Sequence, residues 1–118
     1  TSVLNVDTIA DKAGTGPVTL TKQQAAKAWA DTNATGTTVN DSFNLSSLTD
    51  TSTGQQTFNF STSFNSTSYC SLLTVRNNVS QIWIEDANKA AGSAQGRSFT
   101  GSSYQDVPQD ALFAGDLA

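Results

Sequence analysis

Two stretches in the middle of the chain alternate between apolar and polar residues with a period of two. The alternation runs through Asp41–Leu48 and again through Gln55–Phe64, and the loop Asp50–Gly54 between them has turn chemistry. Because successive side chains of a β-strand point to opposite faces, the pattern predicts two half-buried strands joined as an antiparallel hairpin. Its Ser, Thr and Asn side chains should face outward, and its core face should carry Phe43, Leu45, Phe58, Phe60 and Phe64.

Most of the remaining sequence also favours strands. We expect further strands at Ser68–Arg76, Ser80–Asp86, Arg97–Thr100 and Ala111–Leu117, and a loop of flexible composition at Asn88–Gly96. The chain is 118 residues long, which suits one domain with a single core. The sequence therefore predicts an all-β fold, an antiparallel β-sandwich over residues 25–118.

Trp83 is a candidate contact residue. Ile82 and Ile84 share one face of the predicted strand, so Trp83 and Glu85 point to the other face. If the isoleucines face the core, Trp83 covers the outside of the sheet, where it packs against another subunit or stacks on a sugar ring. In the opposite register Trp83 belongs to the core. Tyr104, in a serine-rich stretch, is a second candidate contact residue.

Residues 1–24 differ from the rest of the chain. Two short extended pieces flank the turn signal Gly14–Pro17, and together they cannot bury much apolar surface. Such a segment needs a partner, and we expect it to form a stalk or a virion anchor. Its apolar residues are Val3, Leu4, Val6, Ile9, Val18 and Leu20.

The segment Thr21–Asp31 gives conflicting signals. Thr21 and Gln24 have the spacing of a capping box, and the alanines between them and Trp29 favour helix. Trp29 before a turn-rich stretch equally suits the start of a strand. Residues 22–28 are thus helix or strand on this reading, and Trp29 is a third candidate interface residue.

Charge is scarce in this chain. Charged residues make up 14% of it, against about 25% in average globular proteins, while Ser, Thr, Asn and Gln supply 49 of the 118 residues. The six basic residues are scattered and the net charge is −4, so no basic patch for nucleic acid is expected. No apolar run reaches the ~18 residues of a membrane span, so membrane insertion is not expected either.

The side chains that catalysis uses are also scarce. The chain has no histidine, which excludes Ser-His-Asp and Cys-His arrangements and most metal sites. Glu85 and Asp86 point to opposite faces of a strand, while Asp106 and Asp110 suit solvated turn positions. Cys70, beside apolar neighbours, is expected to be packed rather than reactive. We therefore expect no enzyme activity, no metal and no cofactor.

A known family shares the order and spacing of several segments here. Four segments resemble a module of tailed-bacteriophage tail fibres, namely Lys27–Trp29, Asn33–Thr37, Asp41–Asp50 and Thr57–Thr62. That module contains KAWVNFNGTG-, DSFNVSSITD- and TVNFTT-like segments. The upstream VDTIADKAGTGPV resembles the segment that often precedes this module. The resemblance covers about half of the chain. This chain departs from the family pattern at Ala30, where a larger aliphatic residue is usual. It also lacks the basic residue that usually precedes the position of Asp41.

The resemblance implies a β-structured, usually homotrimeric component of a phage virion. It favours a strand at residues 26–31, and it supplies no catalytic or ligand residues. We accordingly expect a tail fibre or receptor-binding module, assembled in the bacterial host cytoplasm into the virion. Its expected partners are copies of itself, other virion proteins through the N-terminal segment, and a host surface glycan or protein. The alternative is a head fibre, decoration or baseplate adaptor protein that binds other virion proteins.

Overall fold

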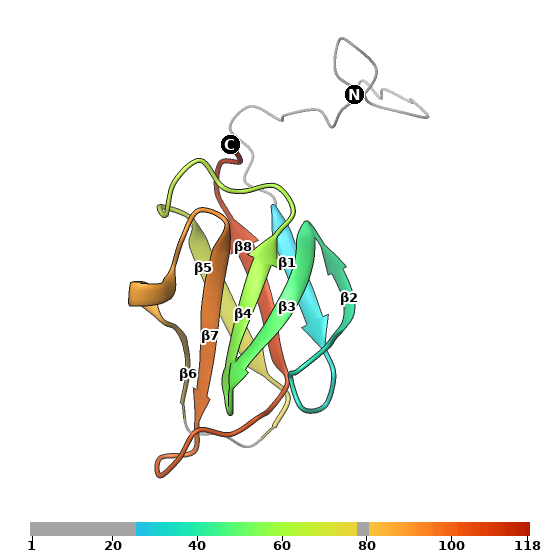
Figure 1. Cartoon of the computed structure of the whole chain (residues 1–118), viewed down its shortest axis with the longest axis vertical. Coiled ribbons are helices and arrows are strands. Elements are labelled where there is room, and N and C mark those ends of the chain that lie inside the picture. The colour runs from blue at the N-terminus through green and yellow to red at the C-terminus, as the bar shows by residue number, and fades with distance from the viewer. Residues whose placement is uncertain (1–25, 78–80) are drawn as a thin grey trace, which may run out of the picture.

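The described part of the chain folds into two antiparallel four-stranded sheets that face each other (Figure 1). A computed structural model describes residues 26–77 and 81–118, so the expected stalk or anchor, with Val3, Leu4, Val6, Ile9, Val18 and Leu20, lies outside the described residues. The all-β expectation is confirmed. The strands are β1 Ala28–Thr32, β2 Val39–Phe43, β3 Leu45–Ser52, β4 Gln55–Phe60, β5 Cys70–Val75, β6 Gln81–Ile84, β7 Ser93–Phe99 and β8 Gln109–Ala114, and a short 3₁₀ turn, η1, spans Asp86–Asn88.

Each sheet combines strands from distant parts of the chain. Sheet A has the order β2-β1-β8-β5 and sheet B the order β3-β4-β7-β6, and every neighbouring pair is antiparallel. The two sheets enclose one core in a sandwich-like arrangement. Each sheet therefore has an inner face toward the core and an outer face away from it.

The ambiguous segment before residue 32 contains a strand. In β1, Ala28, Ala30 and Thr32 are buried while Trp29 and Asp31 alternate with them on the outer face. Small inward side chains let β1 lie close to the opposite sheet. The helix alternative is therefore wrong from Ala28 onward, and residues 22–25 lie outside the described residues.

The predicted hairpin is confirmed for its second half and corrected in its first. β3 and β4 pair antiparallel, with Leu48 opposite Phe58 and Leu45 opposite Phe60, and β3 continues to Ser52, so the loop is shorter than expected. Phe58 and Phe60 are buried as predicted. Phe43, however, belongs to β2 of sheet A and is 54% exposed, so its assignment to the core was wrong.

The cause of this error is a corner at Asn44. Its backbone has φ 55°, the left-handed region that Asn tolerates better than most residues. The side chain fixes the corner, because its Nδ2 donates to the carbonyls of Lys27 and Thr62, both at 3.0 Å, and its Oδ1 accepts from Thr62 N–H at 2.7 Å. The chain thus leaves sheet A at Phe43 and enters sheet B at Leu45.

The core is aromatic. Phe60 lies edge-on to Phe64, Tyr69 and Phe113 at centroid distances of 5.1, 5.7 and 4.9 Å, and Phe58 meets Phe113 at 5.8 Å. Such edge-to-face pairs add about 0.5–1.5 kcal/mol each to the burial of the rings. Partly buried hydrophobic residues close the cluster, namely Leu45, Leu48, Leu73, Ile84 and Leu117.

Buried polar groups occupy the space between the sheets beside Gly54. Gln109 Nε2 donates to Ser98 Oγ at 2.9 Å and to the Gly54 carbonyl at 3.2 Å. Asp106 accepts from Gly54 N–H and from Gln56 Nε2. The expectation of a freely solvated Asp106 was therefore wrong, because its carboxylate joins two loops.

The first part of strand β7 lies where a loop was expected, while a strand was expected from Arg97 onward. Residues 88–96 were assigned to a loop, but Ser93–Phe99 is an interior strand of sheet B. Its inward residues are Ala94, Gly96 and Ser98, which are too small to give an apolar periodic signal. A Cβ atom at Gly96 would lie 2.3 Å from Gln109 Oε1 and 2.8 Å from Leu73 Cδ2, so a larger residue there would displace both side chains.

Candidate binding surfaces

The outer face of sheet B is a surface of hydroxyl and amide groups. Asn59 Nδ2 on β4 donates to Ser47 Oγ at 3.0 Å and Thr49 Oγ1 at 2.9 Å on β3, and the hydroxyls of Thr51 and Thr57 lie 3.2 Å apart. These side chains come from positions that alternate with the buried phenylalanines of β4. The face is therefore neutral, regular and able to exchange hydrogen bonds with a polar ligand.

An aromatic cluster ends this face at the β6 side. Trp83 pairs with Arg97 across β6 and β7 and points outward, so of the two registers left open for it the outward one is present. Its ring centroid lies 6.3 Å from that of Tyr104, and Phe99 meets Tyr104 edge-on at 5.3 Å. All three side chains are partly exposed. Two of the three candidate residues from the sequence, Trp83 and Tyr104, therefore lie together.

An ion pair holds the cluster in place. Arg97 Nη1 lies 3.0 Å from Glu85 Oε2, and Trp83 Nε1 donates to the same oxygen at 3.3 Å. Arg97 also donates to Gln95 Oε1 at 3.1 Å and to the Tyr104 hydroxyl at 3.4 Å. Glu85 thus fixes both an indole and a guanidinium, although a part-exposed pair of this kind contributes at most about 1 kcal/mol.

This aromatic cluster, defined as Trp83, Glu85, Arg97, Phe99 and Tyr104, combines flat apolar rings with charged hydrogen-bonding groups. That combination suits a ligand with one apolar and one hydroxylated side, such as a sugar ring. Sequence reasoning missed Arg97 and Phe99, because the strand register that brings them beside Trp83 comes from a strand it read partly as a loop.

Trp29, the third candidate, lies on the outer face of the other sheet. It is directly opposite Phe43 of β2 on one side and Leu112 of β8 on the other, and Leu112 is opposite Leu72 of β5. Directly opposite residues share a face. These four residues form an apolar row across all four strands of sheet A, and Phe43, Leu112 and Leu72 are 54%, 40% and 61% exposed.

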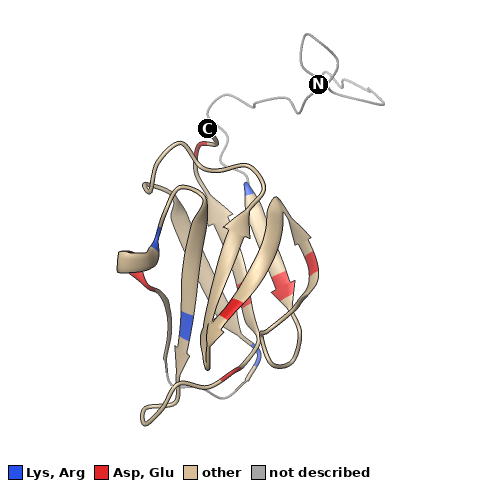
Figure 2. Cartoon of the chain, viewed as in Figure 1, with Lys and Arg blue, Asp and Glu red and all other residues tan. Residues whose placement is uncertain are grey.

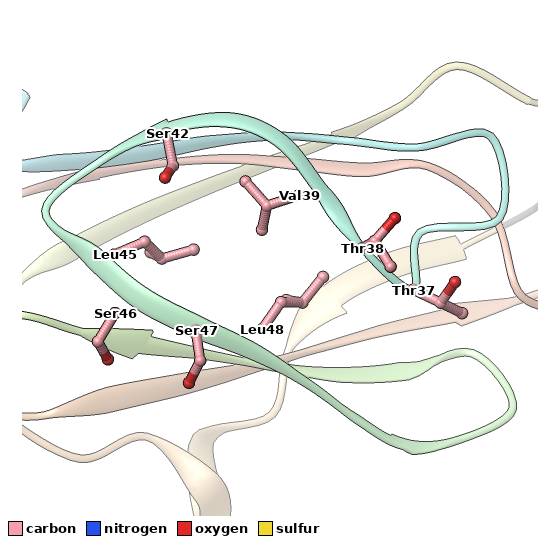
Figure 3. Close-up of a pocket in the computed structure, with 8 residues that line it drawn as sticks. All are labelled: Thr37, Thr38, Val39, Ser42, Leu45, Ser46, Ser47 and Leu48. Carbon is pink, nitrogen blue, oxygen red and sulfur yellow. The ribbon is translucent and has the colours of Figure 1, made fainter.

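A pocket of about 250 Å³ lies at the corner between β2 and β3 (Figure 3). The side chains of Val39, Leu45 and Leu48 point into it, whereas the hydroxyls of Ser46 and Ser47 point away. It is lined by Thr37, Thr38, Val39, Ser42, Leu45, Ser46, Ser47 and Leu48. The pocket is an open gap between diverging strands with an apolar floor, and it brings no titratable side chain to a ligand.

Several titratable groups in the described residues contribute to the structure. Arg76 Nε lies 2.9 Å from Asp110 Oδ2 and Arg76 Nη2 lies 3.1 Å from Asp31 Oδ1, at the end of sheet A. Asp110 lies in β8, not in a solvated turn as expected. Burial raises the pKa of Tyr69 to about 12. Cys70 is exposed on the outer face of β5, which contradicts the packed thiol predicted from its neighbours.

Charged residues are spread thinly over the described surface, and ion pairs join Arg76 to Asp31 and Asp110 and Arg97 to Glu85 (Figure 2). Within residues 26–77 and 81–118, no group of three or more His, Cys, Asp and Glu side chains could hold a metal ion. In the same residues, no helix is long and apolar enough to cross a membrane. Comparisons with protein families, with curated proteins and with solved structures found no match.

Proposed function

We propose that this chain is a structural protein of a tailed-bacteriophage virion, a homotrimeric tail fibre or receptor-binding module that attaches the particle to its host. The proposal starts from the tail-fibre resemblance of residues 27–62. That stretch forms β1 to β4 and includes the Asn44 corner, so the resembling residues supply the framework and the polar face beside the cluster. The residues that bind would then lie in β6, β7 and the loop after β7.

The observation that carries the attachment role is the aromatic cluster at the end of a neutral polar sheet face. Trp83 and Tyr104 present partly exposed rings beside the Glu85–Arg97 pair. The adjoining Ser, Thr and Asn side chains extend the hydrogen-bonding surface. A host surface glycan fits this chemistry, and three copies would add avidity to a weak single site.

The test is binding of the labelled, full-length chain to bacterial cells and to a glycan panel. We expect Trp83→Ala to weaken binding at least about tenfold, since stacked aromatic residues dominate such contacts. Thr67→Ala, at an exposed position in the loop before β5 and outside both the cluster and the polar face, should bind like the parent chain. Equal binding by parent and Trp83→Ala chains, or no binding to any cell or glycan, would contradict the attachment role.

A second candidate function has its own supporting observation. The apolar row on sheet A could instead bind other virion proteins, as in a head fibre, decoration or baseplate adaptor protein. Antibody labelling of whole particles distinguishes the two functions by location. Label at the tail periphery supports attachment, and label on the capsid or neck supports the structural alternative.

A further inference from the structure

The outer face of sheet A carries more exposed apolar surface than a solvated sheet face needs. Its centre is the apolar row Phe43–Trp29–Leu112–Leu72, which runs from one edge strand of the sheet to the other. Antiparallel sheets with one solvated face normally alternate apolar-in and polar-out. Here the inward positions of β1 and β8 hold Ala28, Ala30, Ala111 and Phe113, and the outward positions hold Trp29 and Leu112 beside Asp31 and Asp110.

We propose that this face is a contact surface between copies of this chain, with the aromatic half of one row packed on the aliphatic half of the next. The inference uses only strand register, exposure and charge, and it does not rest on the phage assignment. It names the surface through which copies meet, whatever the virion location of the protein.

The two halves of the row differ in a way that suits self-association. The β2–β1 half projects the large rings of Phe43 and Trp29. The β8–β5 half carries Leu112 and Leu72, which border a hollow of about 360 Å³ that also involves Leu73, Thr74, Asp110 and Ala111. Rings from one copy can therefore fill the hollow of another, as aromatic anchors do at interface centres.

Charge supports the same arrangement. The row beside the apolar one contains Asp41 on β2, Asp31 on β1, Asp110 on β8 and Thr74 on β5. Arg76, half exposed just beyond β5, pairs with Asp31 and Asp110. Asp41 is exposed and has no ion pair among the described residues. Packing the β2 side of one outer face over the β5 side of the next brings that carboxylate toward Arg76.

The two unlike halves of the row also bear on which partner binds. A different protein bound to this face would have to match both halves of the row, whereas another copy matches them by its own sequence.

The test is the mass of the full-length chain in solution, measured by sedimentation over 1–200 µM. We expect a multiple of the 12.4 kDa chain mass. The double variant Leu72→Thr/Leu112→Thr, which keeps β-propensity at two exposed sites, should sediment as a monomer. Gln81→Thr, at an exposed position on edge strand β6 of sheet B, is the matched control and should associate like the parent chain.

A second measurement needs no substitution. Cys70 lies on the same outer face, two residues before Leu72 in β5. Its alkylation rate should fall at least about tenfold between dilute and associated samples. A monomeric parent chain, a row variant of unchanged mass, or a Cys70 rate independent of concentration would each overturn the proposal.

The number of copies bears separately on the proposed function. Three copies agree with the homotrimer, while two copies would contradict the homotrimer and leave the contact surface supported. Conversely, a chain that associates through this face but binds no cell would fail only as a receptor-binding module.

Discussion

The outer faces of the two sheets differ although the sheets have the same number of strands and share one core. Sheet B presents Ser, Thr, Asn and Gln with one aromatic cluster at its edge, and sheet A presents a row of large apolar side chains across its centre. The composition of the chain suggests a uniformly polar surface, but the apolar side chains gather on one side. The contrast assigns different roles: sheet B faces solvent or a soluble ligand, and sheet A suits burial.

The largest expected loss of stability comes from changing Asn44, the corner residue at which the chain passes from sheet A to sheet B. Asn44→Ala places an unfavourable residue at φ 55° and removes three hydrogen bonds, so we expect a loss of about 2–4 kcal/mol in the free energy of unfolding. Chemical denaturation measures it.

Asn44→Gly separates the two contributions. Glycine accepts the backbone angle but makes no side-chain bond, so about 1–2 kcal/mol of the loss should remain. Equal stability of the alanine and glycine variants would show that backbone strain contributes nothing at this corner.

The second prediction concerns the core that both faces cover. Burial raises the pKa of Tyr69 from 10.0 to about 12, because the folded protein disfavours the phenolate. The unfolded chain therefore loses this proton at lower pH than the folded chain. The folded state therefore gains stability from holding the Tyr69 proton more tightly than the unfolded chain does. This contribution to the free energy of unfolding is fully present below pH 10 and is lost as the pH rises through 12.

Denaturation at several pH values from 9 to 12 checks this sign. Tyr69 also donates to the carbonyls of Ala90 and Ser93 at 2.9 Å, so Tyr69→Phe should be less stable at pH 9. The difference in free energy of unfolding between the parent chain and Tyr69→Phe should become smaller above pH 10. A constant gap over the whole range would contradict the role of Tyr69 ionisation.

The third prediction compares the separate replacement of each tryptophan, Trp29 on sheet A and Trp83 on sheet B, by alanine. Trp29→Ala should weaken self-association by about tenfold or more and leave glycan or cell binding per chain unchanged when measured on monomers. Trp83→Ala should do the reverse. Sedimentation and binding measured on both variants give a two-by-two comparison. If both substitutions affect the same measurement, the separation of the two faces into two roles is wrong.

The sequence predicted those elements whose periodicity lies within one strand. β4 was recognisable because Phe58 and Phe60 alternate with polar residues, and Trp83 because two isoleucines flank it. Phe43 was misassigned because the chain passes from sheet A to sheet B at Asn44. The alternation of apolar and polar residues does not reveal such a corner. Only the last residues of β7, from Arg97, were predicted as a strand, because Ala94, Gly96 and Ser98 face the core with almost no hydrophobic signal.

The candidate surfaces depended on register, which local sequence does not encode. Trp83 and Tyr104 were named singly, and their proximity follows from the chain returning after β7 to bridge Phe99 with Tyr104. The apolar row joins residues from four separate segments of the chain. Among its members only Trp29 was named as a contact residue, because Leu72 and Leu112 look like ordinary core residues in their own segments.

The smallest expected effects come from one carboxylate on each face. Glu85→Gln removes the charge that pairs with Arg97, and we expect a loss of no more than about 1 kcal/mol in the free energy of unfolding.

Asp41→Asn should leave stability within about 0.5 kcal/mol, since Asp41 has no ion pair among the described residues. If Asp41 approaches a neighbour's Arg76, however, Asp41→Asn should weaken self-association two- to fivefold at low salt and hardly at all at 1 M salt, where surface charges are screened. An effect of salt on the parent chain that persists unchanged in Asp41→Asn would exclude this contact and leave the apolar row alone responsible for association.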